Sequence, residues 1–429
     1  MTRLPYTARD TLKLSPLETV LFDGTIALCR LLGRWRAPVP ASGDIETMTV
    51  RDKIYWVYKA QYPIERAVPG SGLEAYFAAQ PKHEDALPSD FQPETRATLS
   101  AVGDLMDHPY LAASKRRLYD AVADAIFGVD LPMANLECVI VPGSSPAFVV
   151  RPTASPVLAY DHARFDAAKG ADDGRYGFLC TANNHSLDFG AEGVRSTLDA
   201  LDEAGIATHG MNRAAADAVR PCVLTRNGIR IGLLAHTFGL NAKKPPPDAP
   251  WIVNRTYLNG SAPNDVRQPT RRRRRLTPAD NPVDFGLFEA QLAACRDARV
   301  DLVIGHLHWG MEHELYPRPE QLGVAHHLAE LGVDVVIGHH PHVVQPLELY
   351  RTQRDPDRLV PIFYSLGNLV NPFRHPTFRR GGLAELRVAR GRVPSGAVRT
   401  YVESARLREV FQHVDDDHER LRLELTPNL

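Results

Sequence analysis

The sequence predicts a mixed α/β sandwich, and three observations support this fold class. From Thr98 onward, short apolar runs alternate with amphipathic helical patterns. Most of the apolar runs end in a polar residue, which is typical of a functional site at the carboxyl edge of a sheet. A chain of 429 residues, of which 44% are hydrophobic and 24% charged, is long enough to bury a large core.

The apolar runs mark the expected strands, and helical patterns lie between them. The runs are TLSAVGDLM (98–106), VDLPMANLECVI (129–140), YGFLCTANNH (176–185), RIGLLAHTF (230–238), VDLVIGHLHW (300–309), VDVVIGHH (333–340) and PIFYSLGN (361–368). The helices are expected over KRRLYDAVADAIF (115–127), GVRSTLDALDEAG (193–205), FGLFEAQLAACRDA (285–298) and PEQLGVAHHLAELG (319–332). After Arg380, the alternating segments GLAELRVARG, VRTYVESARL and ERLRLELT predict further antiparallel strands that close the sandwich.

Two regions depart from this rhythm. Residues 1–95 contain hydrophobic runs such as KIYWVYKAQYPI but no strand that ends in a candidate ligand, so we interpret them as an N-terminal extension that binds substrate. Residues 96–429 then form the catalytic domain. Within it, residues 241–284 carry three successive prolines and the run from Arg271 to Arg275, and a connection of this length is usually a functional lid or a disordered loop.

The composition excludes several classes of function. Lys and Arg number 50 and Asp and Glu 51, so the formal charge of −1 gives no reason to expect a nucleic acid or an anionic membrane as a partner. Charged residues interrupt the apolar runs near the N-terminus, which predicts neither a signal peptide nor a membrane anchor. The five cysteines are widely spaced and form no CxxC pair, so we expect a reducing, cytoplasmic location.

Candidate metal ligands stand at or just beyond the ends of successive apolar runs. They are Asp104, Glu137, Asn184, His308, His340 and His342. Carboxylates, an amide and imidazoles, without a thiolate, suit two neighbouring divalent ions (Mn, Co, Fe or Zn) better than a structural zinc. Glu137 could bridge the two ions. Each residue alone is more often a turn or core residue, and it is their joint occurrence that indicates a metal site.

The roles of some histidines stay open at this level. Gly305 to His308 spells G-H-x-H, so either His306 or His308, and His339 as well, could be a ligand, a support for a ligand or a general base. The run from Arg271 to Arg275 has no neighbouring aromatic residues or basic repeats, so we interpret it as a solvated loop and not as a nucleic-acid site.

Six segments of the chain resemble a known family. GDLM, NLE, ANNHSLDFG, HWGMEHELYPRPEQ, GVDVVIGHHPHVVQ and YSLGN, which span about Thr98 to Asn368, are similar to the poly-γ-glutamate capsule-synthesis (CapA) family of the calcineurin-like metallophosphatase superfamily. The resemblance implies a four-layer αββα sandwich with a two-metal site. It also implies that the six candidate ligands bind the metals and that His185 lies next to the reacting group.

The chain departs from the superfamily pattern at two positions. The first superfamily motif places a histidine two residues after the aspartate, whereas Met106 stands there in this chain, and only His108 could substitute for it. The carboxylate at the bridging position is Glu137 and not an aspartate. Both changes reshape the site around one metal, so phosphatase chemistry does not follow from the resemblance alone.

The expected reaction is the epimerisation of a peptide residue. Capsule-synthesis proteins typically carry a membrane anchor, and this chain is more similar to soluble relatives that invert the C-terminal residue of a lasso-type precursor peptide. A metal at the neighbouring carbonyl or carboxylate would stabilise the enolate that forms when the α-proton leaves. The candidates for the acid and base are His185, His306 and His108, since unperturbed histidines titrate near neutral pH.

Three other functions remain open. The same two ions could activate water for the hydrolysis of a phosphoester or an amide. The chain could serve poly-γ-glutamate biosynthesis, as the family resemblance implies. A non-enzymatic scaffold with a degenerate site is the third possibility, and it requires that the protein bind no metal.

Overall fold

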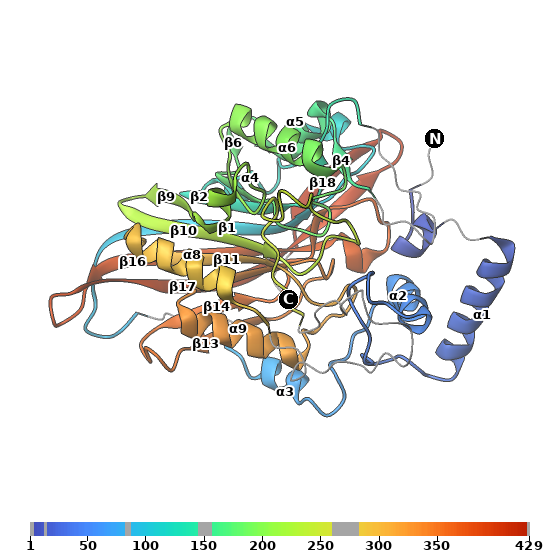
Figure 1. Ribbon diagram of the computed structural model, residues 1–429, viewed down its shortest axis with the longest axis horizontal. Helices are drawn as coiled ribbons and strands as arrows, with labels where there is room; N and C mark the ends of the chain where they lie inside the picture. The colour runs from blue at the N-terminus through green and yellow to red at the C-terminus, as the bar shows by residue number, and fades with distance from the viewer. Residues whose placement is uncertain (1–3, 13–14, 82–86, 145–156, 260–282, 427–429) are drawn as a thin grey trace.

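The structure is a computed structural model in which two large sheets pack face to face. It describes residues 4–12, 15–81, 87–144, 157–259 and 283–426. Helices cover the outer faces of both sheets, and the N-terminal extension lies beyond one end of them (Figure 1). The expected segment 241–284 is therefore described only in part, and the run from Arg271 to Arg275 lies outside the described residues.

The first sheet combines parallel and antiparallel strands. Its order is β18 (Arg420–Leu425), β17 (Val398–Asp415), β16 (Arg380–Arg392), β1 (Gln92–Leu105), β2 (Leu131–Leu136), β7 (Phe178–Cys180) and β8 (Ala207–His209), and β15 (Asn368–Val370) also pairs with β1. Strands β1, β2, β7 and β8 are parallel. Strands β16, β17 and β18 pair in antiparallel fashion, so the prediction of further antiparallel strands after Arg380 is confirmed.

The second sheet has a parallel centre and antiparallel edges. Its order is β13 (Leu347–Arg351), β14 (Leu359–Phe363), β12 (Val335–His339), β11 (Leu302–His308), β10 (Ile229–Thr237) and β9 (Cys222–Arg226). Strands β10, β11, β12 and β14 are parallel, and β9 and β13 close the two edges. Two short ribbons, β3 (Val139–Ile140) with β4 (Ala159–Tyr160) and β5 (Gly170–Ala171) with β6 (Gly174–Arg175), lie outside the sheets.

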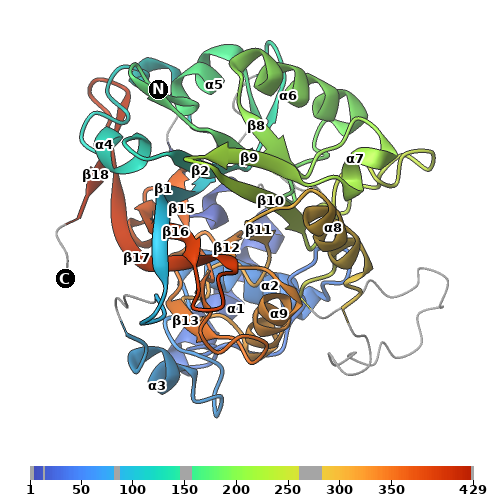
Figure 2. The same cartoon turned by 90° about the vertical axis from the view of Figure 1, so that its left-hand side faces the viewer.

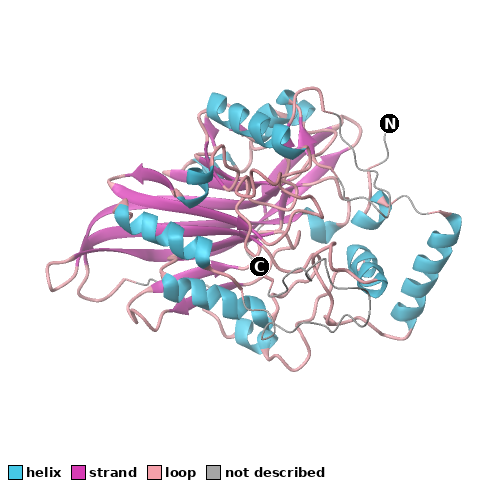
Figure 3. Cartoon of the chain, in the orientation of Figure 1, coloured by secondary structure: helices cyan, strands magenta, loops and turns pink. Residues whose placement is uncertain are grey.

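Helices form the two outer layers (Figure 3). The helices after the N-terminal extension are α4 (Ala123–Phe127), α5 (His162–Ala168), α6 (Gly190–Ala204), α7 (Ala215–Val219), α8 (Gly286–Asp297) and α9 (Pro319–Leu331), with the 3-10 turns η2 (Ala112–Ser114) and η4 (Pro376–Arg379). Figure 2 shows α5 and α6 on the side of the first sheet and α8 and α9 on the side of the second. No helix in the described part of the chain is both long and apolar enough to cross a membrane.

One expected helix is much shorter than its sequence pattern. The pattern over 115–127 predicts a helix, but only α4, at the end of this segment, is helical. The reason is tertiary: the carbonyl of Leu118 accepts a hydrogen bond from the N–H of Leu423 in β18, at 2.9 Å, and the hydroxyl of Tyr119 donates to the carbonyl of Ala168. The first contact takes up a carbonyl that a helix would pair within itself, and the second anchors the side chain of Tyr119 to a distant segment.

Three hydrophobic cores separate four layers, and this confirms the αββα sandwich. One core packs α5 and α6 against the first sheet and includes Phe165, Leu201 and Val102. The second lies between the two sheets, and the third packs α8 and α9 against the second sheet. Because both faces of each sheet are covered, the central strands are apolar throughout and not only at alternate positions.

The N-terminal extension packs against the loop that follows β11. It contains η1 (Ala8–Thr11), α1 (Pro16–Leu31), α2 (Val50–Gln61) and α3 (Leu73–Ala78). On α2, Lys59 forms a buried ion pair of 2.9 Å with Glu314. The N–H of Ile64 donates to the carbonyl of His313, and that of Leu315 donates to the carbonyl of Ile64. The extension therefore contacts the chain directly beside the carboxyl ends of the central strands.

Candidate metal centre

Four strand ends from two sheets bring the predicted ligands together. In the first sheet, Asp104 is the second-to-last residue of β1, and Glu137 directly follows β2. His308 ends β11, and His340 follows β12, in the second sheet. Parallel strands end at the same edge of a sheet, and the face-to-face packing of the sheets places both edges side by side.

The polar side chains at this edge fall into three groups that could each hold a metal ion. The groups are Glu137 with His308 and His340, then Asp104 with Glu137 and His342, and then Glu312 with His340 and His342. Glu137 belongs to the first two groups. A carboxylate shared by two groups is the arrangement that a pair of bridged divalent ions requires. His340 and His342 are also each shared by two groups, and the bridging role of Glu137 stays a prediction.

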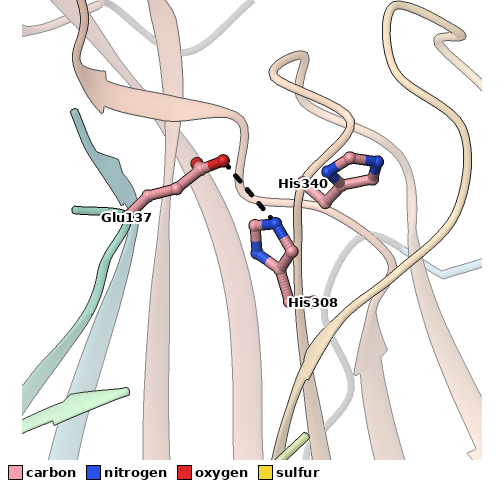
Figure 4. A group of neighbouring side chains, drawn as sticks. All are labelled: Glu137, His308 and His340. Atoms are coloured by element: carbon pink, nitrogen blue, oxygen red, sulfur yellow. Dashed lines mark ion pairs between the residues drawn. The ribbon is translucent and has the colours of Figure 1, made fainter. Parts of the chain in front are cut away.

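The surroundings of Glu137 fit a metal ligand. Figure 4 shows its carboxylate directed at His308, and the Oε1 of Glu137 lies 3.6 Å from the Nε2 of His308. Glu137 is fully buried, yet neither of its oxygens has a hydrogen-bond partner among the described residues. Both ring nitrogens of His340 are likewise buried without a partner. Buried polar atoms are normally paired, so these unpaired atoms indicate room for a cation.

Burial and charge set opposite pKa shifts on the two carboxylates. Burial raises the pKa of Glu137 well above its usual range, and the nearby Asp104 raises it further. Burial alone would also raise the pKa of Asp104, but hydrogen bonds from His339 and His342 outweigh it and hold that pKa well below its usual range. Asp104 also accepts a hydrogen bond of 2.8 Å from the amide of Asn135. Asp104 is thus the firmly ionised member of the pair.

The pKa values of the histidines at the centre differ: burial acts to lower the pKa of His342, but the carboxylate of Asp104 raises it above its usual value, whereas the pKa values of His308 and His340 are lowered. Burial lowers the pKa of His308 and of His340 well below the usual range, so both imidazoles are neutral near pH 7, as metal binding requires. His340 and His342 have φ angles of 97° and 58°, which side-chain-bearing residues rarely adopt. Such backbone strain is typical of functional sites.

One hydrogen bond orients the ring of His342. Its Nδ1 lies 2.9 Å from the Oδ1 of Asn368, the first residue of β15, so Nδ1 carries the proton that this contact needs. The amide of Asn368 also donates to the carbonyl of His342. The Nε2 of His342 is then free to face Glu137, at 3.7 Å. Partners of this kind fix the tautomer of metal-binding histidines.

Asn184 and His185 complete the predicted set. The Oδ1 of Asn184 lies 2.9 Å from the Nε2 of His308. The Nδ1 of His185 lies 2.6 Å from the Oδ2 of Asp188, while its Nε2 is 3.4 Å from the amide nitrogen of Asn241. His185 is in none of the three groups. It is an imidazole beside the centre, oriented by a carboxylate.

The structure does not bring His306 or His108 into the centre. His306 is buried between the sheets, where its ring packs against Phe178 and its Nδ1 lies 3.3 Å from the Nε2 of His339. His108 is also buried, and its Nδ1 accepts a hydrogen bond from the N–H of Tyr110. Burial lowers the pKa of His108 to about 3. These positions give no support to a catalytic role for either residue.

Met106 shows how the departure from the superfamily motif is accommodated. Its side chain belongs to the apolar core between the first sheet and its helices. Its carbonyl accepts a hydrogen bond from the hydroxyl of Tyr160. A methionine here supplies packing and no nitrogen ligand, so this position lacks the donor that the superfamily pattern has.

Sequence reasoning missed three residues of the site. They are Asp188, Glu312 and Asn368. Each lies in a segment that carries the family resemblance, but a motif letter does not tell which way a side chain points. For Asp188 a signal existed, because it follows His185 by three residues on one turn of chain.

Comparison with known proteins agrees with this geometry. Residues 98–372 match the model of the family described as bacterial capsule synthesis protein PGA_cap. The chain belongs to the PGA_cap family. The matched range contains every residue of the three groups.

Several curated proteins are similar to this PGA_cap chain. It is 27% identical over 206 residues to the PGA biosynthesis protein CapA of Bacillus subtilis (strain 168), which covers 48% of this chain and 45% of that protein. It is 31% identical over 204 residues to a probable polyglutamine synthesis accessory protein of Mycobacterium tuberculosis (strain H37Rv), covering 46% and 47%. An uncharacterized protein of Sinorhizobium fredii is 27% identical over 311 residues, covering 63% and 65%. The match to the first two thus spans about half of their length.

Proposed function

We propose that this PGA_cap protein is a metal-dependent epimerase that inverts the α-carbon of a residue, at or near the C-terminus, in a lasso-type precursor peptide. The observation that carries the proposal is the position of His185, next to the metal groups but in none of them. A site that only bound metal would not need this imidazole. A site that moves a proton needs such a base beside a positive centre.

The ligand set favours a pair of divalent ions such as Mn, Co, Fe or Zn. Asp104, Glu137, Asn184, His308, His340 and His342 would hold them. Bound there, the ions would stabilise negative charge on the oxygen of the substrate carbonyl or carboxylate next to the α-carbon.

The residues around His185 are arranged for proton transfer. The carboxylate of Asp188 holds the proton on Nδ1, so Nε2 is the nitrogen that can accept a proton, and the side-chain amide of Asn241 lies 3.4 Å from it. Nε2 takes the α-proton, and the electron pair of the C–H bond moves onto the carbonyl oxygen. Return of a proton to the opposite face restores the carbonyl and inverts the carbon, so no atom is gained or lost.

We infer that the N-terminal extension borders the opening through which a peptide would enter. Asp104, Glu137 and His308 are fully buried, whereas the side chain of Glu312 is 16% exposed, so the centre is most open at Glu312. Trp56, on α2, donates a hydrogen bond to this same carboxylate. We infer that the extension and the described part of 241–284, whose Asn241 contacts His185, form the walls of the peptide site.

Solvent exchange tests the proposed reaction. The metal-loaded protein is incubated with a candidate precursor peptide in D₂O. The mass of the intact product is measured by mass spectrometry, and a second portion is hydrolysed for chiral analysis of its amino acids. We expect one deuterium at the inverted position and no other change in mass. His185→Gln should lower the rate by about 10²-fold or more, as loss of a general base does. His327→Gln on α9 is the matched control. Inversion without deuterium uptake would contradict the mechanism.

Hydrolysis is the second candidate, and a specific observation favours it. Two metal groups that share one carboxylate also suit the activation of water for attack on a phosphoester or an amide. Two bacterial relatives are named for PGA biosynthesis and for capsule biosynthesis, and the resemblance to the poly-γ-glutamate family adds such a polymer as a candidate substrate for either reaction. Release of phosphate from an aryl phosphate, or fragments of a peptide or of polyglutamate with unchanged stereochemistry, would favour hydrolysis.

A further inference from the structure

We propose that Glu312 is an additional ligand of the metal centre, and that the N-terminal extension holds it in place through Trp56. This inference rests on the metal centre in the proposed function but not on the reaction. It makes the extension a part of the centre, in addition to any contact with substrate.

The first observation is the position of the carboxylate. Glu312 forms one of the three potential metal groups with His340 and His342. Its Oε1 lies 4.0 Å from the Nε2 of His342, and the same nitrogen lies 3.7 Å from Glu137. Two carboxylates therefore lie within 4.0 Å of one nitrogen of His342, and one of them comes from outside the predicted ligand set.

The second observation is the contrast between Glu312 and its neighbour Glu314. Glu314 is fully buried and forms ion pairs with two cations, Lys59 at 2.9 Å and Arg318 at 2.8 Å. Within the described ranges, no lysine or arginine lies within 4.0 Å of Glu312. Its contacts are with Trp56 and His342. A carboxylate that is grouped with two imidazoles, and that has no lysine or arginine beside it among the described residues, is suited to a metal.

The third observation is that the backbone fixes the direction of Glu312. His313 has a φ angle of 63°, which turns the chain between the two glutamates. The N–H of His313 donates to the carbonyl of Pro341, between His340 and His342, at 2.8 Å. The carbonyl of His313 accepts a hydrogen bond from the N–H of Ile64 in the extension, at 2.9 Å. Residues 312–314 are thus held between residues 340–342 and the extension.

Trp56 connects the extension to the carboxylate itself. Its indole N–H donates to the Oε2 of Glu312, which leaves Oε1 on the side of His342. The ring also packs near His313, with centroids 6.0 Å apart. Carboxylates that bind metals commonly accept a hydrogen bond on one oxygen, and the other oxygen binds the metal.

Metal titration tests the inference without any assay of activity. Binding of MnCl₂ to the full chain is measured by calorimetry, with the bound metal counted by mass spectrometry. We expect Glu312→Gln to weaken binding by about 10- to 100-fold, and Trp56→Phe by roughly tenfold, as loss of a partner to a ligand does. Glu289→Gln on α8 and Trp35→Phe in the extension are the matched controls, because neither residue contacts the centre.

The outcomes separate this inference from the proposed function. Weaker binding by both variants with unchanged controls would support it. If Glu137→Gln abolishes binding but Glu312→Gln binds Mn²⁺ like the wild type, Glu312 is not a ligand and the proposed function stands. If Trp35→Phe weakens binding as much as Trp56→Phe, the effect is one of general packing and the role of Trp56 is refuted. Failure of the wild type to bind any divalent metal would overturn both proposals.

Discussion

The buried carboxylate of Glu137 should make the metal-free protein less stable as the pH rises, and Glu137→Gln isolates this effect. Burial raises the pKa of Glu137 well above its ordinary value of 4.5. Between pH 4.5 and the raised pKa, the folded protein keeps a proton that the unfolded chain has released. The free energy of unfolding therefore falls by about 1.4 kcal/mol for each pH unit in this range.

Urea unfolding of the wild type and Glu137→Gln in the presence of a chelator measures this slope. Glutamine has nearly the same shape and does not titrate, so other buried groups cancel in the difference between the two proteins. Above pH 5, the free energy of unfolding of the wild type should fall relative to that of the variant by about 1.4 kcal/mol for each pH unit, until the pH reaches the raised pKa of Glu137.

Addition of Mn²⁺ should stabilise the wild type more than Glu137→Gln, which is opposite to the effect of raising the pH without metal. Metal binding needs the ionised carboxylate, and at a free concentration of 100 times Kd it stabilises the native state by about 2.7 kcal/mol. The variant should gain much less. A difference that does not depend on pH in chelator, or equal stabilisation of both proteins by Mn²⁺, would refute the placement of Glu137 as a buried bridging ligand.

Three further predictions concern the supports of the centre. Asn368→Ala removes the acceptor that fixes the ring of His342 and should weaken Mn²⁺ binding by about 10- to 100-fold in calorimetry, without loss of the fold. Lys59→Met removes one of the two cations that pair with the buried Glu314 and should lower the free energy of unfolding by about 3 kcal/mol, measured in urea. A change smaller than the error of the fit would count against the buried ion pair. Gly338→Ala should lower it by about 1–3 kcal/mol or more, because the new methyl group would overlap the backbone of Tyr364, whereas Gly323→Ala on α9 meets no atom within 4 Å and should be neutral or stabilising.

The strand ends were the most predictable part of the site. The apolar runs of the sequence contain β11 and β12 and cover the C-terminal part of β1, which begins earlier, at Gln92; Asp104 and His308 stand where the runs predict strand ends. This works because a strand that is buried on both faces must be apolar, so a polar side chain marks the point where the strand leaves the core. The grouping of these ends at one edge follows from parallel pairing.

Which histidines lie at the edge of the sheet and which lie inside it could not be predicted in this way. His306 and His308 are two residues apart on β11, so they lie on the same face of the sheet. Only depth along the strand separates them: His308 reaches the edge, while His306 stays between the sheets beside Phe178. Periodicity gives the face of a residue but not its distance from the edge.

The sequence by itself determined the α/β class, the positions of most central strands along the chain and the chemical type of the candidate ligands, because local periodicity and burial act on neighbours along the chain. Tertiary structure alone decided that Glu137 is shared by two groups and that Glu312 turns towards His342 while Glu314 turns towards Lys59. These directions depend on a left-handed backbone at His313 and on packing against the N-terminal extension, more than 240 residues earlier in the chain. Contacts over such separations leave no periodic signal, so no pattern in the sequence could have shown them.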